Sequence, residues 1–364
     1  MIRIRLVQQW TTGTEGALDL DQRLLPALDA IQHTGSVSQA ANTLGVSYRF
    51  LWGLLLRWGN LLGSPLAILE RGRGAKLTSF GEKLLWADKR IAARLSPMLD
   101  SMASELELEL QPMLSRESGV LRIHASHGFA VDVLREDLAT AAIPVELKYI
   151  GSREALLSLR DEKCDLAGFH VPVGDLEALA LRQFEPGISQ PDFAVIELAT
   201  RQQGLMTAID NPKRIRQFRD LADLRCRFVN RQAGSGTRVL FDLLLAQQGI
   251  DASQITGYDV VEYTHAAVAA FVASGMADVG FGIETGARRF GLHFIPVATE
   301  RYFFLCRKSR LQTAPVQAAL QLMNSDDFKS KVNKLPGYRA ENCGAIAEVR
   351  KVFPSIARAP IRKR

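Results

Sequence analysis

The stretch Phe228–Arg238, FVNRQAGSGTR, decides how the larger part of this chain is built. Its apolar beginning favours a strand, and a helix is expected directly after it, over Val239–Gln248. The loop between them combines glycines, which let backbone N–H groups approach a ligand, with side-chain donors: Gly234, Ser235, Gly236, Thr237 and Arg238. It lacks the lysine of a P-loop and the third spaced glycine of a dinucleotide-binding loop, so it suits a small oxyanion better than a nucleotide.

Strands and helices alternate on both sides of this stretch. Gly119–Ala125 and Val145–Ile150 are expected strands, and Val131–Ala139 is an expected helix between them. A helix also precedes each of two similar segments, Cys164–Phe169 and Ala277–Gly282. The alternation predicts a mainly parallel sheet covered by helices. The similarity of the two segments predicts two similar α/β lobes.

Polar residues recur where the expected strands end. Ser126–Gly128 and Gly151–Ser152 each open a helix, Gly168–His170 follows a buried strand, and Glu262–His265 opens another helix. Ligands of open α/β sheets bind beyond the carboxyl ends of strands, and helix N-termini attract anions. The predicted ligand-binding residues are Ser126, His127, Ser152, His170, Gly234, Ser235, Gly236, Thr237, Arg238, Tyr263, Thr264 and His265, with Arg238 supplying formal charge.

A structural role stays open for several of these residues. Ser152 or Thr264 alone fits an ordinary helix cap, and the three histidines fit hydrogen-bonded structural residues. The histidines lack metal-ligand spacing, and no catalytic constellation of Ser, His and acid is identified. The four cysteines lie far apart and are expected to be buried free thiols: Cys164, Cys226, Cys306 and Cys343. We therefore predict no catalytic residue, no metal-ligating residue and no cofactor.

A different pattern lies near the N-terminus. Leu24–Ile31 has the apolar spacing of a helix, Gly35–Ser36 breaks it, and Val37–Leu44 is a short second helix. Gly45 can take the left-handed conformation of a tight turn, and Ser47 can cap a third helix. Two helices joined in this way place the second one in a DNA major groove.

The third helix is followed by a basic hairpin. Leu66–Glu70 and Lys76–Thr78 are expected strands around the turn Arg71–Ala75, which completes a winged helix-turn-helix. Tyr48 and Arg49 are predicted to enter the groove. The full set of predicted DNA-binding residues is Ser38, Gln39, Ser47, Tyr48, Arg49, Arg57, Arg71 and Arg73. Three residues of the third helix are expected to face the core instead: Trp52, Leu55 and Leu56. A small helical subdomain with a solvated basic face is the alternative.

A long helix is expected from Gly81 to about Leu110, ending near Gln111–Pro112 and kinked at Pro97. Its apolar residues recur at roughly helical spacing: Leu84, Ile91, Leu95, Met98, Leu99, Met102 and Leu106. Such a helix can pair with a copy of itself, so a homodimer or tetramer is expected. The alternative is that it packs on its own winged helix.

Composition agrees with a DNA-binding globular protein. The 364 residues are 47% hydrophobic and 23% charged, enough for two or three domains. The net charge is +6, and Ser47–Ser96 holds nine Lys or Arg against three acidic residues. No apolar run reaches the length of a membrane span, and Met1–Val7 lacks the apolar core of a secretory signal. We therefore expect a cytoplasmic protein that does not bind a membrane.

The N-terminal pattern resembles the DNA-binding domain of the molybdate-responsive ModE family, which is related to LysR-type winged helices. The resemblance covers about residues 15–110 and rests on Gly35–Ala41, Gly45–Arg49, Trp52, Arg71–Ala75, Leu77–Thr78 and Gly81. It ends there, because ModE regulators sense molybdate with small β-barrel domains, whereas this chain continues as α/β.

Residues 120–310 resemble the periplasmic-binding-protein-like domain related to molybdate- and tungstate-binding proteins. The matching segments are Ser126–His127, Gly151–Ser152, Asp165–His170, Gln203–Leu205, Asn211–Pro212, Arg227–Gln232, Gly234–Arg238 and Glu262–His265. The resemblance implies a type II periplasmic-binding-protein-like fold, whose two lobes close on a ligand across crossover strands near Phe193–Leu205 and Leu292–Leu305.

Together these patterns predict an α/β protein with three regions. They are a winged helix-turn-helix (1–80), a linker and dimerisation helix (81–115) and a two-lobed domain (116–364), with lobe 1 at about 118–198 and 295–350 and lobe 2 at about 199–294. The hypothesis is a non-enzymatic, homo-oligomeric transcription regulator. It would bind a double-stranded DNA operator, sense molybdate or tungstate, and control genes of molybdenum or tungsten metabolism or of a molybdoenzyme. The same regulator sensing molybdenum cofactor or a small organic anion such as formate is one alternative. A cytoplasmic oxyanion-delivery protein is another.

Overall fold

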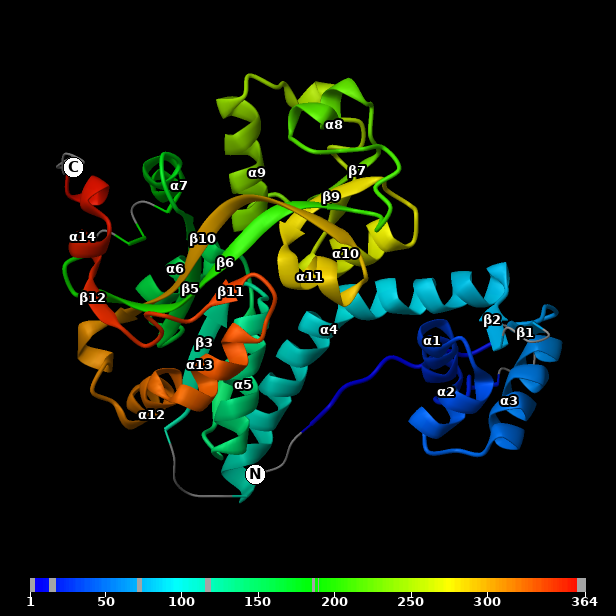
Figure 1. Cartoon of the computed structure of the whole chain (residues 1–364). Coiled ribbons are helices and arrows are strands. Elements are labelled where there is room, and N and C mark those ends of the chain that lie inside the picture. Colours follow the sequence, from blue (N-terminus) through cyan, green and yellow to red (C-terminus); the bar gives the residue numbers. More distant parts are fainter. Residues whose placement is uncertain are drawn as a thin grey trace. The chain divides into compact units, whose positions relative to one another are not determined.

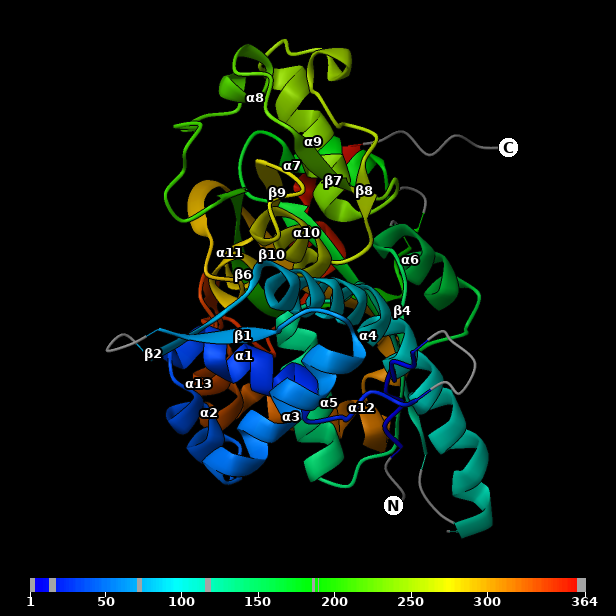
Figure 2. The same cartoon turned by 90° about the vertical axis from the view of Figure 1, so that its right-hand side faces the viewer.

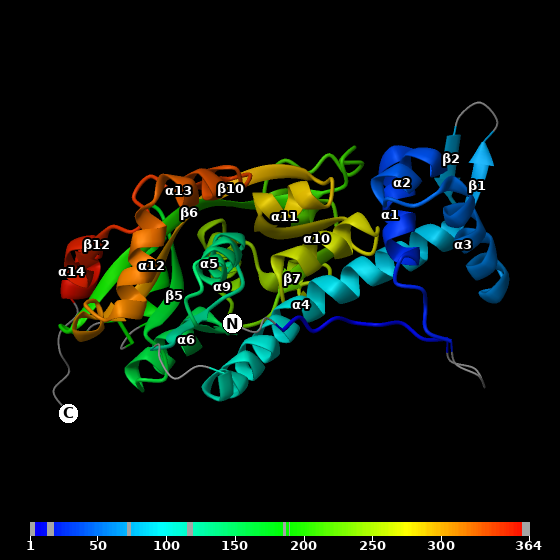
Figure 3. The same cartoon turned by 90° about the horizontal axis from the view of Figure 1, so that it is seen from below.

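The computed structural model describes residues 4–12, 18–70, 74–114, 119–184, 187–188 and 190–358. The chain divides into two compact units, a smaller one of residues 7–93 and a larger one of residues 1–6 and 94–364 (Figure 1). The boundary falls inside helix α4 (Ser79–Leu114), which Figure 3 shows as one uninterrupted helix. The first part of α4 therefore belongs to one unit and the rest to the other.

The smaller unit has the predicted helices and hairpin. Helices α1 (Leu24–Thr34), α2 (Val37–Thr43) and α3 (Tyr48–Leu61) are followed by the antiparallel strands β1 (Ala67–Glu70) and β2 (Gly74–Leu77). The order of helix, turn, helix and hairpin is therefore confirmed. Most of the hairpin turn, residues 71–73, lies outside the described residues.

Local chemistry explains where these helices begin and end. Gly45 has a φ of +66°, the left-handed conformation expected between α2 and α3. The Ser47 hydroxyl caps α3 by accepting a hydrogen bond from Phe50 N at 3.1 Å. Leu55 is buried as expected and Trp52 is partly buried, but the prediction for Leu56 is wrong, because this side chain is 50% exposed. One helical residue turns the side chain by about 100°, so the neighbour of a core residue can face solvent.

The larger unit is built on one sheet that runs through two lobes. In chain order its first lobe begins with β3 (Leu121–Ala125), α5 (Phe129–Thr140), β4 (Val145–Tyr149), α6 (Ser152–Arg160), β5 (Leu166–Pro172) and α7 (Glu177–Arg182). The long strand β6 (Phe193–Thr207) crosses to the second lobe, which holds α8 (Arg219–Asp223), β7 (Phe228–Arg231), α9 (Gly236–Gln247), β8 (Val261–Glu262), α10 (His265–Ala273), β9 (Val279–Ile283) and α11 (Glu284–Arg289) (Figure 2).

Strand β10 (His293–Arg307) crosses back along β6, and the chain ends on the first lobe. The remaining elements are α12 (Ala314–Asn324), α13 (Asp326–Asn333), β11 (Tyr338–Arg339), β12 (Ile346–Glu348) and α14 (Val349–Val352). The crossover strands match the two expected ones, and the predicted α/β fold with two lobes is confirmed.

The strand order is β4-β3-β5-β10-β6-β9-β7-β8, with β4 and β8 at the two edges. Strands pair in parallel within each lobe, as β3 does with β4 and β5, and β7 with β8 and β9. The crossovers β6 and β10 are antiparallel to each other and to their neighbours β9 and β5. The sheet is therefore mixed rather than mainly parallel, because the chain must cross between the lobes in both directions.

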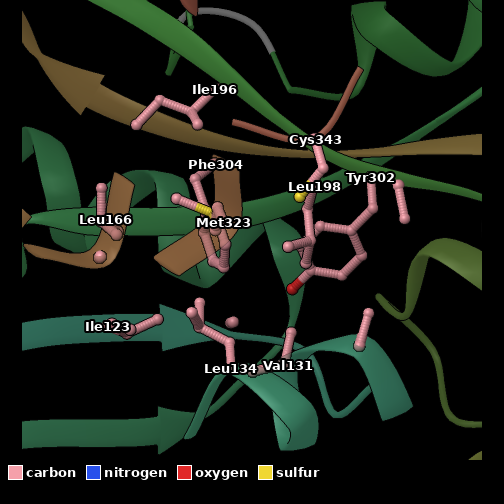
Figure 4. Close-up of a cluster of buried hydrophobic side chains, with 14 of the residues drawn as sticks. Ile123, Val131, Leu134, Leu166, Ile196, Leu198, Tyr302, Phe304, Met323 and Cys343 are labelled. Carbon is pink, nitrogen blue, oxygen red and sulfur yellow. The ribbon is translucent and has the colours of Figure 1, made fainter. Parts of the chain in front are cut away.

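Each lobe has its own apolar core. In the first lobe, strands β3 and β5, helices α5 and α12 and the crossovers bury their side chains together (Figure 4), among them Ile123, Val131, Leu134, Leu166, Leu198, Phe304 and Met323. The second lobe buries an aromatic group that includes Phe218, Phe228, Phe241 and Phe281. All four cysteines are free and buried, as predicted.

Helix α4 spans nearly the same residues as the linker helix expected at 81–115. It begins at Ser79 and runs through Pro97 and Pro112 to Leu114, two residues beyond Gln111–Pro112. A proline removes one backbone donor, and near a helix end the loss of that one hydrogen bond does not stop the helix. At Pro97, the carbonyl oxygen accepts a hydrogen bond from the Ser101 hydroxyl at 2.9 Å.

Gly81 is the tightest point in the packing of α4 in the smaller unit. A Cβ at this position would stand 2.1 Å from the Leu66 carbonyl oxygen, whereas one at Gly53 on α3 would meet nothing within 4 Å. We expect Gly81→Ala to lower the free energy of unfolding by about 1–3 kcal/mol, because backbone must move. Gly53→Ala should instead raise it by about 0.5–1 kcal/mol.

Denaturant unfolding followed by tryptophan fluorescence measures this, because all four tryptophans lie in residues 7–93. Equal stability of the two variants would show that α4 can shift away from Leu66 at no cost.

Candidate DNA-binding face and anion site

The predicted DNA-binding residues that the structure describes are all exposed on α2, on α3 or at the start of α3: Ser38, Gln39, Ser47, Tyr48, Arg49 and Arg57. The Tyr48 side chain is 45% exposed and thus accessible to a binding partner. Tyr48 and Arg49 stand in the first turn of α3, where a recognition helix meets base edges. Arg71 and Arg73 lie outside the described residues.

In the larger unit, four helices begin where strands end. Helix α5 follows β3, α6 follows β4, α9 follows β7 and α10 follows β8. Their N-caps are Gly128, Gly151, Ser235 and Thr264. Because parallel strands within a lobe end at the same edge, the free N–H groups of these helices gather between the lobes. The region is therefore electropositive before any side chain is counted.

His170 of the first lobe lies where the two lobes meet. Its Nδ1 lies 3.4 Å from Ser126 Oγ and 3.3 Å from Ser152 Oγ, and its ring packs edge-on against Tyr302 at 4.2 Å. A Cβ on Gly236, at the start of α9 in the second lobe, would stand 3.6 Å from the same Nδ1. The start of α9 in the second lobe thus lies in contact with His170 of the first.

Two buried arginines, Arg201 and Arg231, supply positive charge to the region between the lobes. Arg201 on β6 bonds the Glu300 carboxylate on β10 through Nε at 3.0 Å and Nη2 at 2.9 Å, and both side chains are 1% exposed. Gln203 Nε2 donates to the same carboxylate at 2.8 Å and to Thr237 Oγ1 at 3.0 Å. Burial lowers the pKa of Arg201, but the charge and hydrogen bonds of Glu300 together with Tyr338 outweigh burial, so the pKa is raised.

Arg231, at the end of β7, lacks such a carboxylate. Its Nε donates to Gln232 Oε1 at 3.2 Å and its Nη2 to the Tyr263 carbonyl oxygen at 3.0 Å. Burial, followed by the charge of Arg201, lowers the pKa of Arg231 to about 9. A cation in this position is stabilised by an added anion.

Several polar atoms here have no hydrogen-bond partner among the described residues. They are Arg201 Nη1, Arg231 Nη1, Gln203 Oε1 and His265 Nδ1, all on side chains that are at most 4% exposed. Buried polar groups are normally paired, so such a set indicates a place for a ligand. We call Ser126, Ser152, His170, Arg201, Gln203, Arg231, Thr237, His265, Glu300 and Tyr302 the polar cluster.

The histidines of this region are held neutral. Burial first, then the charges of Arg201 and Arg231, keeps the pKa of His170 and of His265 well below the ordinary value. Burial also lowers the pKa of His127, against the opposing effect of Asp132. The positive charge of the polar cluster therefore comes from its arginines.

The structure brings most of the predicted ligand residues together but not all of them. Ser126, Ser152, His170, Thr237 and His265 belong to the polar cluster. Gly234, Ser235, Gly236 and Thr264 form the beginnings of α9 and α10, where the Ser235 and Thr264 hydroxyls act as caps. His127 turns toward α5, with its Nε2 3.5 Å from Asp132 Oδ2.

Two predicted residues point elsewhere. Arg238 bonds Asp242 at 3.0 Å and stacks on Tyr258 at 4.0 Å, so its charge is already compensated. The Tyr263 side chain is 62% exposed, and only its carbonyl oxygen reaches the polar cluster. The expectation that Arg238 supplies the charge is corrected to Arg201 and Arg231, because a helix turns Arg238 toward its i+4 partner.

Sequence reasoning missed Arg201, Gln203, Arg231, Glu300 and Tyr302 as site residues. The signal was present in the crossovers, since Arg201, Gln203 and Glu300 interrupt otherwise apolar expected strands. A charged side chain in a strand buried on both faces needs a partner, and here that partner lies 99 residues away.

No group of three or more His, Cys, Asp or Glu side chains among the described residues is placed to hold a metal ion. No described helix is long and apolar enough to span a membrane.

Two known families match the chain. One, the "PBP superfamily domain", matches residues 135–324, more than half of the chain. The chain belongs to the PBP superfamily. The other, "Bacterial regulatory helix-turn-helix protein, lysR family", matches residues 22–82. This PBP superfamily protein thus carries a LysR-type helix-turn-helix domain at its N-terminus.

Several known proteins are similar to this chain. YvgK of Bacillus subtilis (strain 168), described as uncharacterized, is 32% identical over 221 residues, 60% of this chain and 70% of its own. The "Molybdenum transport protein ModE" of Herbaspirillum seropedicae is 28% identical over 190 residues, 50% of this chain and 69% of that protein. A solved structure of a mutant OxyR of Corynebacterium glutamicum is 18% identical with a TM-score of 0.41, covering 82% of this chain and 92% of that one. The family matches and the ModE relative confirm the predicted resemblance.

We expect a buried histidine to make the stability of the larger unit depend on pH. Burial, followed by Lys148 and Arg122, lowers the pKa of His124 on β3 from 6.5 to about 4. The folded state thus binds fewer protons than the unfolded chain, so stability is complete above pH 6.5 and falls toward pH 4. We expect His124→Leu to remove about 3 kcal/mol of this acid-induced loss.

Calorimetric unfolding from pH 7 to pH 4 tests this, with the exposed His33 on α1 replaced by Leu as the matched control. An equally steep loss in the His124 variant and the wild type would contradict the assignment.

Proposed function

We propose that this LysR-type protein is a transcription regulator whose polar cluster binds a small oxyanion, and that this binding changes operator affinity. The observation that carries the proposal is the pair of buried arginines, each with an Nη1 that has no partner among the described residues. Glu300 compensates Arg201, so Arg231 leaves an excess positive charge in a region lined by helix N-termini. An anion with several acceptor oxygens would satisfy these donors.

Molybdate or tungstate is the proposed effector. A tetrahedral dianion offers acceptor oxygens in four directions, which matches donors that converge from both lobes. The resemblance to molybdate- and tungstate-binding domains and the relative named for molybdenum transport support this choice. The regulated genes would then serve molybdenum or tungsten metabolism or a molybdoenzyme.

One observation favours an organic anion as the second candidate. Gln203 Oε1 has no donor among the described residues, and its amide orientation is fixed because Nε2 must face the Glu300 carboxylate. A ligand with an O–H or N–H group, such as the molybdenum cofactor or another organic anion with such a group, would satisfy it. Molybdate has no proton to offer.

We also propose that the protein acts as a homo-oligomer in the cytoplasm and has no enzymatic activity. Helix α4 exposes Met98, Met102 and Leu106, which lie four residues apart on one stripe and are 58%, 52% and 38% exposed. Such a stripe favours pairing with the same helix of a second copy. A two-fold dimer would present two recognition helices to a palindromic operator.

Calorimetric titration with molybdate, tungstate, sulfate and formate tests the effector. We expect molybdate and tungstate to bind, and Arg231→Gln to weaken binding by about 100-fold, since a buried charge-assisted contact contributes about 1.5–3 kcal/mol. Arg238→Gln should bind nearly as the wild type does. Binding lost in Arg238→Gln but kept in Arg231→Gln would favour the residue expected from sequence, and an equal loss in both would contradict the special role of Arg231. Silence for all four anions would overturn an inorganic effector.

Operator binding tests the DNA-binding face. Sites selected from random DNA should bind Arg49→Ala about tenfold more weakly, with discrimination against random DNA reduced, because a base contact contributes about 1–3 kcal/mol. Arg57→Ala should weaken specific and random DNA alike. If Arg49→Ala also weakens both equally, Arg49 contacts phosphate rather than bases.

A further inference from the structure

The part of α4 that belongs to the larger unit is fixed to the edge of the first lobe. Strand β4 is an edge strand, and the Ser104 hydroxyl donates to Val145 O at 3.1 Å and accepts from Leu147 N at 2.9 Å. Ser101 Oγ accepts from Tyr149 N at 3.1 Å. Ser101 and Ser104 thus form hydrogen bonds with backbone N–H and C=O groups that an edge strand leaves unpaired.

The same helix reaches the opposite edge of the sheet through Arg94. Its Nε lies 2.7 Å from Glu262 Oε2 and 3.0 Å from Oε1, and Nη2 also bonds the carboxylate. Glu262 ends β8, the edge strand of the second lobe, and is 1% exposed. Two residues later Thr264 caps α10, whose first residue is His265.

This ion pair differs from ordinary surface pairs. The pair Arg288–Glu284 on α11 joins two partly exposed side chains within one helix, and such pairs contribute little. The Glu262 carboxylate is buried, so loss of Arg94 would leave a buried charge without its cation. Arg94 is therefore strongly bound to the second lobe.

A rigid helix can hold both edges in only one arrangement of the lobes. Arg94 and Ser101 are separated by about 10 Å along the helix axis, a distance that cannot stretch. The arrangement that satisfies both contacts is the one in which the lobes meet, with a Cβ on Gly151 standing 3.4 Å from Gly234 O. Movement of the lobes apart would break one of the two sets of contacts.

We propose that Arg94 is a positioning residue. Through Glu262 it holds β8 and the start of α10 where they complete the polar cluster, so anion binding and the attachment of α4 to the second lobe favour each other. The effect on anion binding rests on the proposed function, whereas the effect on β8 does not. Linkage requires that the coupling is reciprocal, so the anion also strengthens the hold on α4.

Hydrogen exchange of the full-length protein without ligand tests the positioning. We expect Arg94→Gln to accelerate exchange in residues 261–268 by about tenfold or more. Arg288→Gln is the matched control, because Arg288 is 49% exposed and Arg94 48%. Arg94→Lys should give an intermediate rate, because it keeps the charge and loses the forked bond. Equal rates in Arg94→Gln and Arg288→Gln would overturn the proposal, whatever the effector is.

Titration of the same variants with molybdate tests the coupling. Arg94→Gln should bind about fivefold or more weakly than Arg288→Gln, with Arg94→Lys between them. Equal affinities would overturn the coupling while leaving the proposed function intact. If the wild type does not bind molybdate, the proposed effector fails, and the exchange rates still decide the role of Arg94.

Discussion

The buried pair of Arg201 and Glu300 is the constraint around which the larger unit is organised. The two residues face each other in register on β6 and β10, the strands that connect the lobes. Two charges with 1% exposure are costly to bury unless their geometry and remaining hydrogen bonds are good. Gln203 contributes one of those bonds and ties the pair to Thr237 at the start of α9. The crossover strands and the second lobe therefore share one hydrogen-bond network.

The same pair explains why the polar cluster has an excess of one positive charge. Glu300 is committed to Arg201, so nothing of comparable strength compensates Arg231, and the neutral histidines add no charge. Burial lowers the pKa of Arg231 and of the histidines. It keeps the histidines neutral, and it makes the charged form of Arg231 less favourable. A bound anion would offset this uncompensated charge, which is the physical basis of the proposed anion binding.

What the sequence reveals depends on the distance over which an interaction acts. The turn at Gly45, the cap at Ser47 and the strand ends before α5, α6, α9 and α10 are local features, and they were predictable. The partner of Arg201 is remote in the chain, so its role appears only when β6 and β10 pair. Arg231 and Arg238 stand seven residues apart in the same motif, and only the fold shows that Asp242 and Tyr258 engage Arg238. The prediction for Leu56 failed because one helical step separates this exposed side chain from the buried Leu55.

The contacts of helix α4 with the sheet have two effects: they cover both edge strands, and they depend on how the lobes are arranged. Open edge strands expose unpaired backbone groups that can pair with other chains, and α4 contacts both edges of this sheet, with serines on β4 and Arg94 on the last residue of β8. Protection of the edges alone would not need a buried carboxylate, since any polar cover would serve. The buried Glu262 carboxylate instead requires one cation. That cation, Arg94, comes from a helix whose first part belongs to the smaller unit. The Arg94–Glu262 contact therefore depends on the arrangement of the lobes, because one rigid helix can contact both edge strands only while the two edges stay within its reach.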